Sequence, residues 1–161
     1  MRLSKVLEGV AHSRVGVPGD PEIRGIAYDS RQVKPGFLFV CISGFKTDGH
    51  LFINDAREKG AAAILAEKET ADFNLPVALC KDSRQALARV AGNFHHHPSR
   101  QLRLIGVTGT NGKTTTTHLI KAILEEAGKK TGIMGTLYAR VGEQSFDLGR
   151  TTPEAPDIEA F

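Results

Sequence analysis

Long apolar runs are missing from this sequence. No segment approaches the roughly 20 apolar residues that a membrane-spanning helix needs, and the opening stretch, MRLSKVLEGVAHSRVG, contains no unbroken apolar run of the length found in secretion signals. These absences argue against a membrane protein and against a secreted one. We therefore expect a cytoplasmic protein with no membrane partner.

Cysteine is scarce, with two residues in the chain. Cys41 and Cys80 each lie in an apolar run, FLFVCI and VALC, where a small buried side chain is expected. No cysteine spacing typical of a metal site is present. We expect two reduced core residues, neither paired in a disulfide nor acting as a nucleophile.

Segregated charge is also missing. The formal net charge is +3 and the isoelectric point is near 9.0, but acidic residues are interspersed among the basic ones. A nucleic-acid surface usually concentrates Lys and Arg in a patch or stripe. We therefore expect no nucleic-acid partner, whereas a phosphorylated small substrate fits this mild positive charge.

What the sequence does contain is a glycine- and threonine-rich segment, LRLIGVTGTNGKTTTT, at residues 102–117. Its first part, residues 102–107, predicts a strand, and a helical pattern follows Gly112. Glycines at such a junction let backbone N–H groups turn toward an anion, while the helix N-terminus and Lys113 add positive charge. Thr114 stands where these loops place a hydroxyl on Mg²⁺. The segment predicts a nucleoside triphosphate site.

The match to the common phosphate loop, G-x-x-x-x-G-K-[ST], is a variant because Val107 replaces the first glycine. A glycine-rich turn between strand and helix is also an ordinary tight connection in α/β proteins. The four threonines from Thr114 to Thr117 favour the phosphate site, since β-branched residues lose side-chain freedom in a helix. Local preferences are broken in this way at functional sites.

Residues 1–98 predict a layered α/β domain. Strands are expected at 22–28, 37–42, 61–67 and 76–80, and a helix at 51–59 stopped by Gly60. A further helix begins after Asp82, which can cap it together with Gln85. The apolar stripe of this helix consists of Ala86, Leu87, Val90, Ala91 and Phe94.

Residues 99–161 predict a second unit with a strand at 102–107, a helix at 113–127 closed by Gly128, and a strand at 131–137. This order predicts a right-handed parallel crossover and the start of a P-loop-type parallel α/β domain. The unit has about 60 residues, fewer than the roughly 100–150 of a usual domain. We therefore expect this second domain to be incomplete.

The triplet His95-His96-His97 is not expected to bind a metal ion. Consecutive residues on a helix point about 100° apart, so their side chains cannot converge on one ion. We interpret the triplet as the polar end of a helix.

The run GVTGTNGKTTTTHLI resembles the ATP loop of the Mur ligase family, in which the departure at Val107 is normal. The blocks YDSR at 28–31, PGFLFVCISGFKTDGH at 35–50 and TTPEAPD at 151–157 resemble the branch of this family that extends UDP-MurNAc-L-Ala-D-Glu. The similarity covers essentially the whole chain, and its blocks follow the family's order.

The resemblance implies an ATP-dependent, ADP-forming amide ligase of peptidoglycan synthesis. Such enzymes transfer the γ-phosphate of ATP to the terminal carboxylate of UDP-MurNAc-L-Ala-D-Glu. A diamino acid, meso-diaminopimelate or L-lysine, then displaces phosphate from the acyl phosphate. The implied organisation is monomeric, with a UDP-sugar-binding domain at 1–98 and the beginning of the central ATP-binding domain at 99–161. We expect this fragment alone to be inactive.

The resemblance also implies roles for individual residues. Lys113 would be catalytic by binding the β- and γ-phosphates, and Thr114 would bind Mg²⁺. The implied ATP-binding residues are Gly109, Thr110, Asn111, Gly112, Lys113, Thr114 and Thr115. The implied substrate-binding residues are Tyr28, Ser30, Phe45, Lys46, Thr47, Thr151 and Thr152. Without the resemblance, residues 29–31 read as a turn and TTPEAP as a proline-rich connector with a helix cap.

Two other functions stay open on the sequence. Another ligase of the superfamily, such as MurF or a folylpolyglutamate synthetase, would share the loop but act on a different substrate, and the DSR and TTPE blocks argue against it. A nucleotide-binding module without chemistry of its own is the second alternative.

Overall fold

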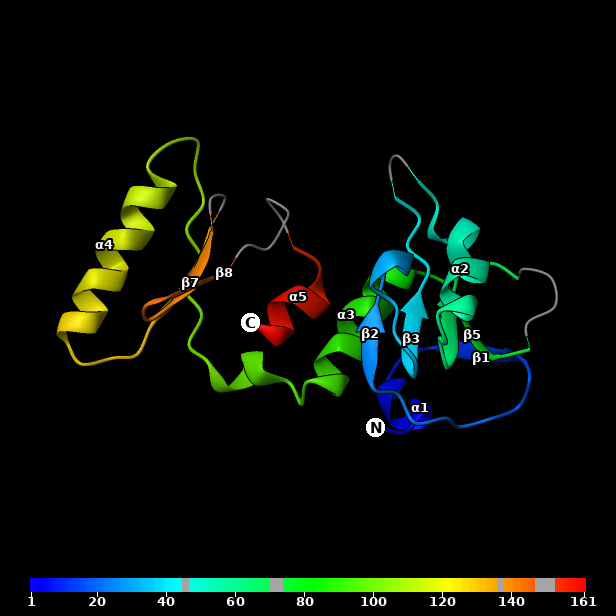
Figure 1. Cartoon of the computed structure of the whole chain (residues 1–161). Coiled ribbons are helices and arrows are strands. Elements are labelled where there is room, and N and C mark those ends of the chain that lie inside the picture. Colours follow the sequence, from blue (N-terminus) through cyan, green and yellow to red (C-terminus); the bar gives the residue numbers. More distant parts are fainter. Residues whose placement is uncertain (45–46, 70–73, 136–137, 147–152) are drawn as a thin grey trace.

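The computed structural model describes residues 1–44, 47–69, 74–135, 138–146 and 153–161, which contain a five-stranded and a three-stranded sheet (Figure 1). The predicted α/β class is therefore confirmed. The first sheet is built by residues before α3 (Ser83–Phe94), and the second by residues after the long helix α4 (Lys113–Glu126). None of the described helices is long and apolar enough to cross a membrane.

The five-stranded sheet has the order β1-β5-β4-β3-β2. Strands β2 to β5 run parallel, and β1 pairs antiparallel with the outer edge of β5, where His12 lies opposite Cys80. Because parallel strands point the same way, the carboxyl ends of β2, β3, β4 and β5 share one edge of the sheet. The strands are β1 (His12–Gly16), β2 (Gly25–Ala27), β3 (Phe37–Val40), β4 (Ala63–Ala66) and β5 (Pro76–Cys80).

Helices cover both faces of this sheet, which explains the continuous apolar runs of its strands. In β3, Leu38 and Val40 pack in the core formed with α1 and α3, whereas Phe39 packs in the core formed with α2. The elements are α1 (Leu3–Val6), η1 (Ser30–Gln32), η2 (Gly49–Phe52), α2 (Ile53–Glu58) and α3 (Ser83–Phe94).

The sequence pattern located most of this unit correctly. Each of the predicted strands in residues 22–80 contains an observed strand, and α2 ends before Gly60, whose φ is +88°. The carboxylate of Asp82 accepts from the backbone N–H of Gln85 at 2.9 Å, which confirms the predicted N-terminal cap of α3. Cys41 and Cys80 are free and buried, which confirms their assignment to the core. Not anticipated were α1 and β1, whose four and five residues are too few to give a clear periodic pattern.

The second part of the chain differs from the prediction. The expected strand at 102–107 is wrong, because no strand is assigned there and Leu102, Leu104 and Ile105 are 65%, 74% and 55% exposed. The predicted parallel crossover is also absent from the described residues: β6 pairs antiparallel with β7, and β7 with β8. Without a neighbouring strand, residues 102–107 have no hydrogen-bonding partner that would make them a strand. The elements are η3 (Pro98–Gln101), α4 (Lys113–Glu126), β6 (Gly132–Met134), β7 (Ala139–Val141), β8 (Gln144–Phe146) and α5 (Ala155–Ala160).

The histidine triplet forms the end of α3, as expected. His95 is the C-cap, and its backbone N–H donates to Ala91. His96 and His97 adopt positive φ values of 61° and 54°, and the N–H of His97 donates to the carbonyl of Gly92 at 2.7 Å. The chain turns here from the first sheet into η3.

Candidate functional site

The carboxyl edge of the five-stranded sheet gathers predicted substrate-binding residues. Tyr28 and Ser30 directly follow β2, and the segment that carries Thr47 follows β3. Glu67 follows β4, and Ser83 begins α3 after β5. In open α/β sheets, ligands bind at the carboxyl ends of the strands. This edge is therefore the candidate substrate site.

Ser30 is held firmly at this edge. Asp29 accepts from the backbone N–H of Arg31 at 3.0 Å and from its guanidinium at 2.7 Å, which caps η1. Ser30 is buried, and its carbonyl accepts from the ammonium of Lys59 at 2.9 Å. The turn inferred from residues 29–31 is thus present, and it fixes the backbone of a predicted binding residue.

After β3, the described residues on either side of positions 45–46 are joined by backbone hydrogen bonds. A bridge pairs Ser43 with Asp48, and the N–H of Gly44 donates to the carbonyl of Thr47 at 3.0 Å. Thr47, a predicted substrate contact, is exposed. The predicted contacts Phe45 and Lys46 lie outside the described residues.

The base of this loop is closed by a buried histidine that sequence reasoning missed. His50 is 8% exposed, and its Nδ1 lies 2.5 Å from the Asp48 carboxylate. Its Nε2 accepts from the backbone N–H of Glu67 at 3.0 Å, so Nδ1 carries the proton that is donated to Asp48. The hydrogen bonds from His50 hold the pKa of Asp48 well below its usual range. The loop after β3 is thereby attached to the end of β4.

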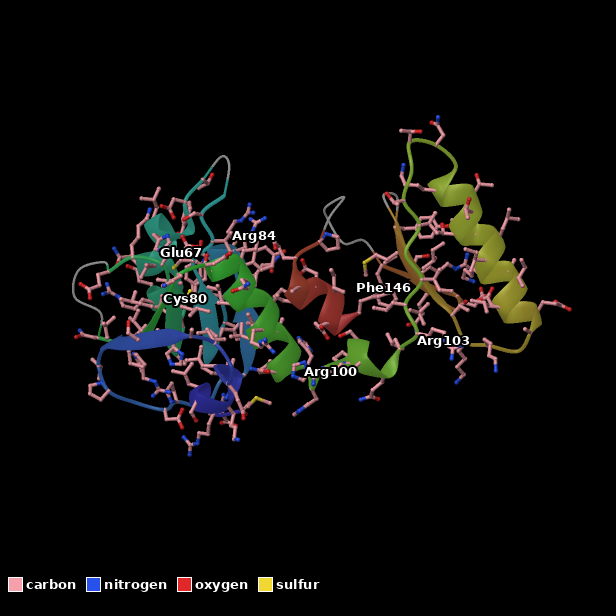
Figure 2. The ribbon with its side chains drawn as sticks, turned by 180° about the vertical axis from the view of Figure 1, so that it is seen from behind. Glu67, Cys80, Arg84, Arg100, Arg103 and Phe146 are labelled. Carbon is pink, nitrogen blue, oxygen red and sulfur yellow. The ribbon has the colours of Figure 1, made fainter. Side chains whose placement is uncertain are left out.

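Glu67 continues this network to the start of α3. Its carboxylate accepts from the backbone N–H and from the hydroxyl of Ser83, both at 2.8 Å. The backbone bond from Ser83 is the main cause that lowers the pKa of Glu67. Figure 2 shows Glu67 and Arg84 on the side where α3 begins, with Arg100 beyond the other end of that helix. The ends of β3, β4 and β5 are thus linked by polar side chains.

The short helix α5 also reaches this edge. The hydroxyl of Tyr28 donates to the Asp157 carboxylate at 2.6 Å, and Arg84 forms an ion pair with Glu154 at 3.3 Å. Tyr28 directly follows β2, and Arg84 lies on α3, so both contacts join the α5 segment to the first part of the chain. The predicted binding residues Thr151 and Thr152 lie outside the described residues, and they precede α5 in the chain.

The glycine-rich segment before α4 is the predicted phosphate loop, and two of its glycines adopt positive φ values. Gly109 and Gly112 adopt φ values of 151° and 76°, which side-chain-bearing residues rarely take. Gly112 is the N-cap of α4, and the ammonium of Lys113 donates to the carbonyl of Gly109 at 2.6 Å. Lys113 therefore points back over the loop at the helix N-terminus, where an anion would be stabilised.

The rest of the predicted ATP site consists of the exposed residues Thr110, Asn111, Thr114 and Thr115. The carbonyl of Thr114 accepts from the hydroxyl of Thr117 at 2.9 Å, and Thr114 is itself an exposed residue in the first turn of α4. In the described part of the chain, no three His, Cys, Asp or Glu side chains are grouped to hold a metal ion. Among the residues of this segment, Thr114 is the predicted Mg²⁺ ligand.

Comparison with known proteins decides the family. The model described as "Mur ligase family, catalytic domain" matches residues 22–95, and the "Mur ligase middle domain" matches residues 107–161. The chain belongs to the Mur ligase family. Both the carboxyl edge with Ser30 and the glycine-rich loop with Lys113 fall within the matched residues.

The Mur ligases most similar to this chain include diaminopimelate-adding enzymes. The chain is 56% identical to the UDP-N-acetylmuramoyl-L-alanyl-D-glutamate–2,6-diaminopimelate ligase of Syntrophomonas wolfei, with 100% of this chain and 33% of that protein covered. The corresponding ligase of Caldanaerobacter subterraneus is 42% identical, with 99% and 33% covered. The chain thus spans about a third of the length of the curated relatives it matches.

Solved Mur ligase structures share the fold. A UDP-N-acetylmuramoyl-L-alanyl-D-glutamate–2,6-diaminopimelate ligase aligns with a TM-score of 0.68 and 29% identity, over 86% of this chain and 28% of that chain. The MurF ligase of Thermotoga maritima, solved in complex with ADP, aligns with a TM-score of 0.55 and 32% identity, over 70% and 25%.

Proposed function

We propose that this chain is part of an ATP-dependent ligase that adds a diamino acid to UDP-MurNAc-L-Ala-D-Glu in peptidoglycan synthesis. The observation that carries the proposal is the 56% identity to a diaminopimelate-adding ligase over the full length of this chain. The two sites described above occur within that similarity. The whole enzyme would use ATP with Mg²⁺ and act as a monomer in the cytoplasm.

The two parts of the chain would divide the work. Residues 1–98 would hold the UDP-sugar, and residues 99–161 would begin the ATP-binding domain. Substrate contacts would come from Tyr28, Ser30 and Thr47 at the carboxyl edge, with further contacts from Phe45, Lys46, Thr151 and Thr152. The buried position of Ser30 and the exposed position of Thr47 support a site between η1 and the loop after β3.

The chemistry needs an activated carboxylate, because an unmodified carboxylate oxygen is a poor leaving group. Lys113 would stabilise negative charge on the β- and γ-phosphates, and the N–H groups at the start of α4 would orient them. The hydroxyl of Thr114 suits Mg²⁺, a hard cation that prefers oxygen ligands, and the bound ion would neutralise phosphate charge. Positioning and charge neutralisation are what these residues contribute.

Calorimetric titration of the chain with Mg-ATP and with UDP-MurNAc-L-Ala-D-Glu tests this proposal. Lys113→Ala should weaken Mg-ATP binding about tenfold or more, because a hydrogen bond to a charged group contributes about 1.5–3 kcal/mol. UDP-MurNAc-dipeptide binding should not change. Lys129→Ala, which removes an exposed lysine beyond α4, is the matched control. Equal Mg-ATP affinities in both variants would rule out this loop as the phosphate site.

The choice between ligase types requires a second titration. The unmodified chain should prefer UDP-MurNAc-L-Ala-D-Glu to the corresponding tripeptide and to folate. Preference for the tripeptide would indicate a MurF-type enzyme, and binding of folate would indicate a folylpolyglutamate synthetase.

A further inference from the structure

Helix α5 packs against the first part of the molecule. Its residues belong to the segment matched by the middle-domain model, yet it packs along α3 of the first sheet. Figures 1 and 2 both show α5 beside α3. Six residues are too few for a helix to be stable by itself in water. The contacts with the first sheet therefore keep α5 in place.

Polar contacts with the rest of the chain lie at both ends of α5. At its start, Asp157 accepts from the hydroxyl of Tyr28 at 2.6 Å, and Glu154 pairs with Arg84 at 3.3 Å. Near its end, Glu159 accepts from the hydroxyl of Ser99 at 3.1 Å. The Ser99 contact lies on η3, whereas the Tyr28 contact lies on the candidate substrate edge.

Asp157 connects two features with one carboxylate oxygen. The same Oδ2 that accepts from Tyr28 also accepts from the backbone N–H of Glu154 at 3.2 Å, which completes the capping box of α5. The orientation of the Tyr28 ring and the first turn of α5 are thus fixed together. A charge-bearing hydrogen bond of this kind is stronger than one between neutral groups.

We propose that Asp157 is a positioning residue for the uridine nucleotide site. It holds Tyr28 in the orientation that contacts the nucleotide, and it couples nucleotide binding to the docking of α5. This inference rests on the proposed function, because it takes Tyr28 to be a uridine contact. Coupling of binding equilibria is reciprocal, so the nucleotide stabilises docked α5 by the same factor by which docked α5 raises nucleotide affinity.

Titration with UDP, used as the probe, tests the first half of the proposal. Asp157→Ala should lower UDP affinity about tenfold, which corresponds to about 1.4 kcal/mol. Asp157→Asn keeps an acceptor oxygen for the Tyr28 hydroxyl and should recover much of that affinity. Ser99→Ala is the matched control, since it removes a hydrogen bond to the same helix away from Tyr28. It should lower UDP affinity less than Asp157→Ala does, because it leaves the bond between Tyr28 and Asp157 in place.

A double mutant separates positioning from general support of the fold. If Asp157 acts through Tyr28, the variant Tyr28→Phe/Asp157→Ala should bind UDP no more weakly than Tyr28→Phe alone. Additive losses would overturn the inference, and so would equal losses in Asp157→Ala and Ser99→Ala.

Hydrogen exchange tests the reciprocal half. Saturating UDP should slow amide exchange in residues 155–160 of the unmodified chain and should not do so in Tyr28→Phe. Unchanged exchange in the unmodified chain would overturn the coupling while leaving the proposed function intact. If the unmodified chain binds neither UDP nor UDP-MurNAc-dipeptide, the proposed function itself is overturned, and this inference falls with it.

Discussion

Replacement of His50 by alanine should measure how firmly the loop after β3 is attached to the sheet. The ring is 8% exposed and bonds to both the Asp48 carboxylate and the N–H of Glu67. His50→Ala removes the Nε2 acceptor and leaves the part-buried backbone N–H of Glu67 unpaired, which costs about 1–3 kcal/mol. Asp48 keeps its bonds to the backbone N–H of residue 50 and to Lys68. We therefore expect His50→Ala to lower the free energy of unfolding by about 2–3 kcal/mol.

Urea titration followed by circular dichroism gives this free energy. Lys68→Ala is the control within the same network, because it removes an ion pair between Lys68 and Asp48 whose lysine is mostly exposed. Such a pair contributes about 0–1 kcal/mol. Losses of the same size in both variants, or a loss below about 0.5 kcal/mol in His50→Ala, would show that the buried imidazole does not fasten the loop.

Two further predictions concern the metal and pH. Thr114→Val should raise the Mg²⁺ concentration needed for nucleotide binding, because it removes the hydroxyl proposed to bind the ion. Thr117→Val should have a mild effect, since the Thr117 hydroxyl already donates to the Thr114 carbonyl. Equal effects of the two variants in a Mg²⁺ titration would assign both threonines to packing. Stability should fall as the pH is lowered below about 4.5. The folded-state pKa values of Asp48 and Glu67 lie below their ordinary values of 3.8 and 4.5. Both ionised carboxylates therefore stabilise the fold at higher pH, and this stabilisation is lost as they are protonated at lower pH. Thermal melts of the unmodified chain and of Glu67→Gln between pH 3 and 7 should show a weaker acid effect in the variant, and parallel curves would contradict the assignment to Glu67.

The strands and helices of the first sheet could be predicted because the local sequence pattern there matches the burial that the folded structure gives each residue. The run FLFV is apolar on both sides, and the structure buries it on both faces. Asp82 followed by Gln85 is a local cap signal, and the observed bond joins those residues. Ser30 and Thr47 were chosen as binding residues by resemblance to a known family, and the parallel pairing of β2 and β3 places both at one edge of the sheet.

Other features depend on contacts between residues distant in the chain, which local patterns do not encode. His50 and Glu67 are separated by 17 positions, and Tyr28 and Asp157 by 129. The prediction of a strand at 102–107 was wrong for the same reason, since an apolar run becomes a strand only when another strand pairs with it. The family block that includes DGH contained a signal for His50, because a histidine two residues after an aspartate can form a local ring-to-carboxylate bond.

The docking of α5 makes residues 102–153 a closed loop of the chain. The element before this loop, η3, and the element after it, α5, are joined by the hydrogen bond between Ser99 and Glu159. The entropy of closing such a loop grows slowly, by about 0.6 kcal/mol for each doubling of its length. Extra residues inserted at the β7–β8 turn around Gly142 would therefore hardly weaken the attachment of α5. The length of this closed loop can therefore vary while Asp157 stays beside Tyr28.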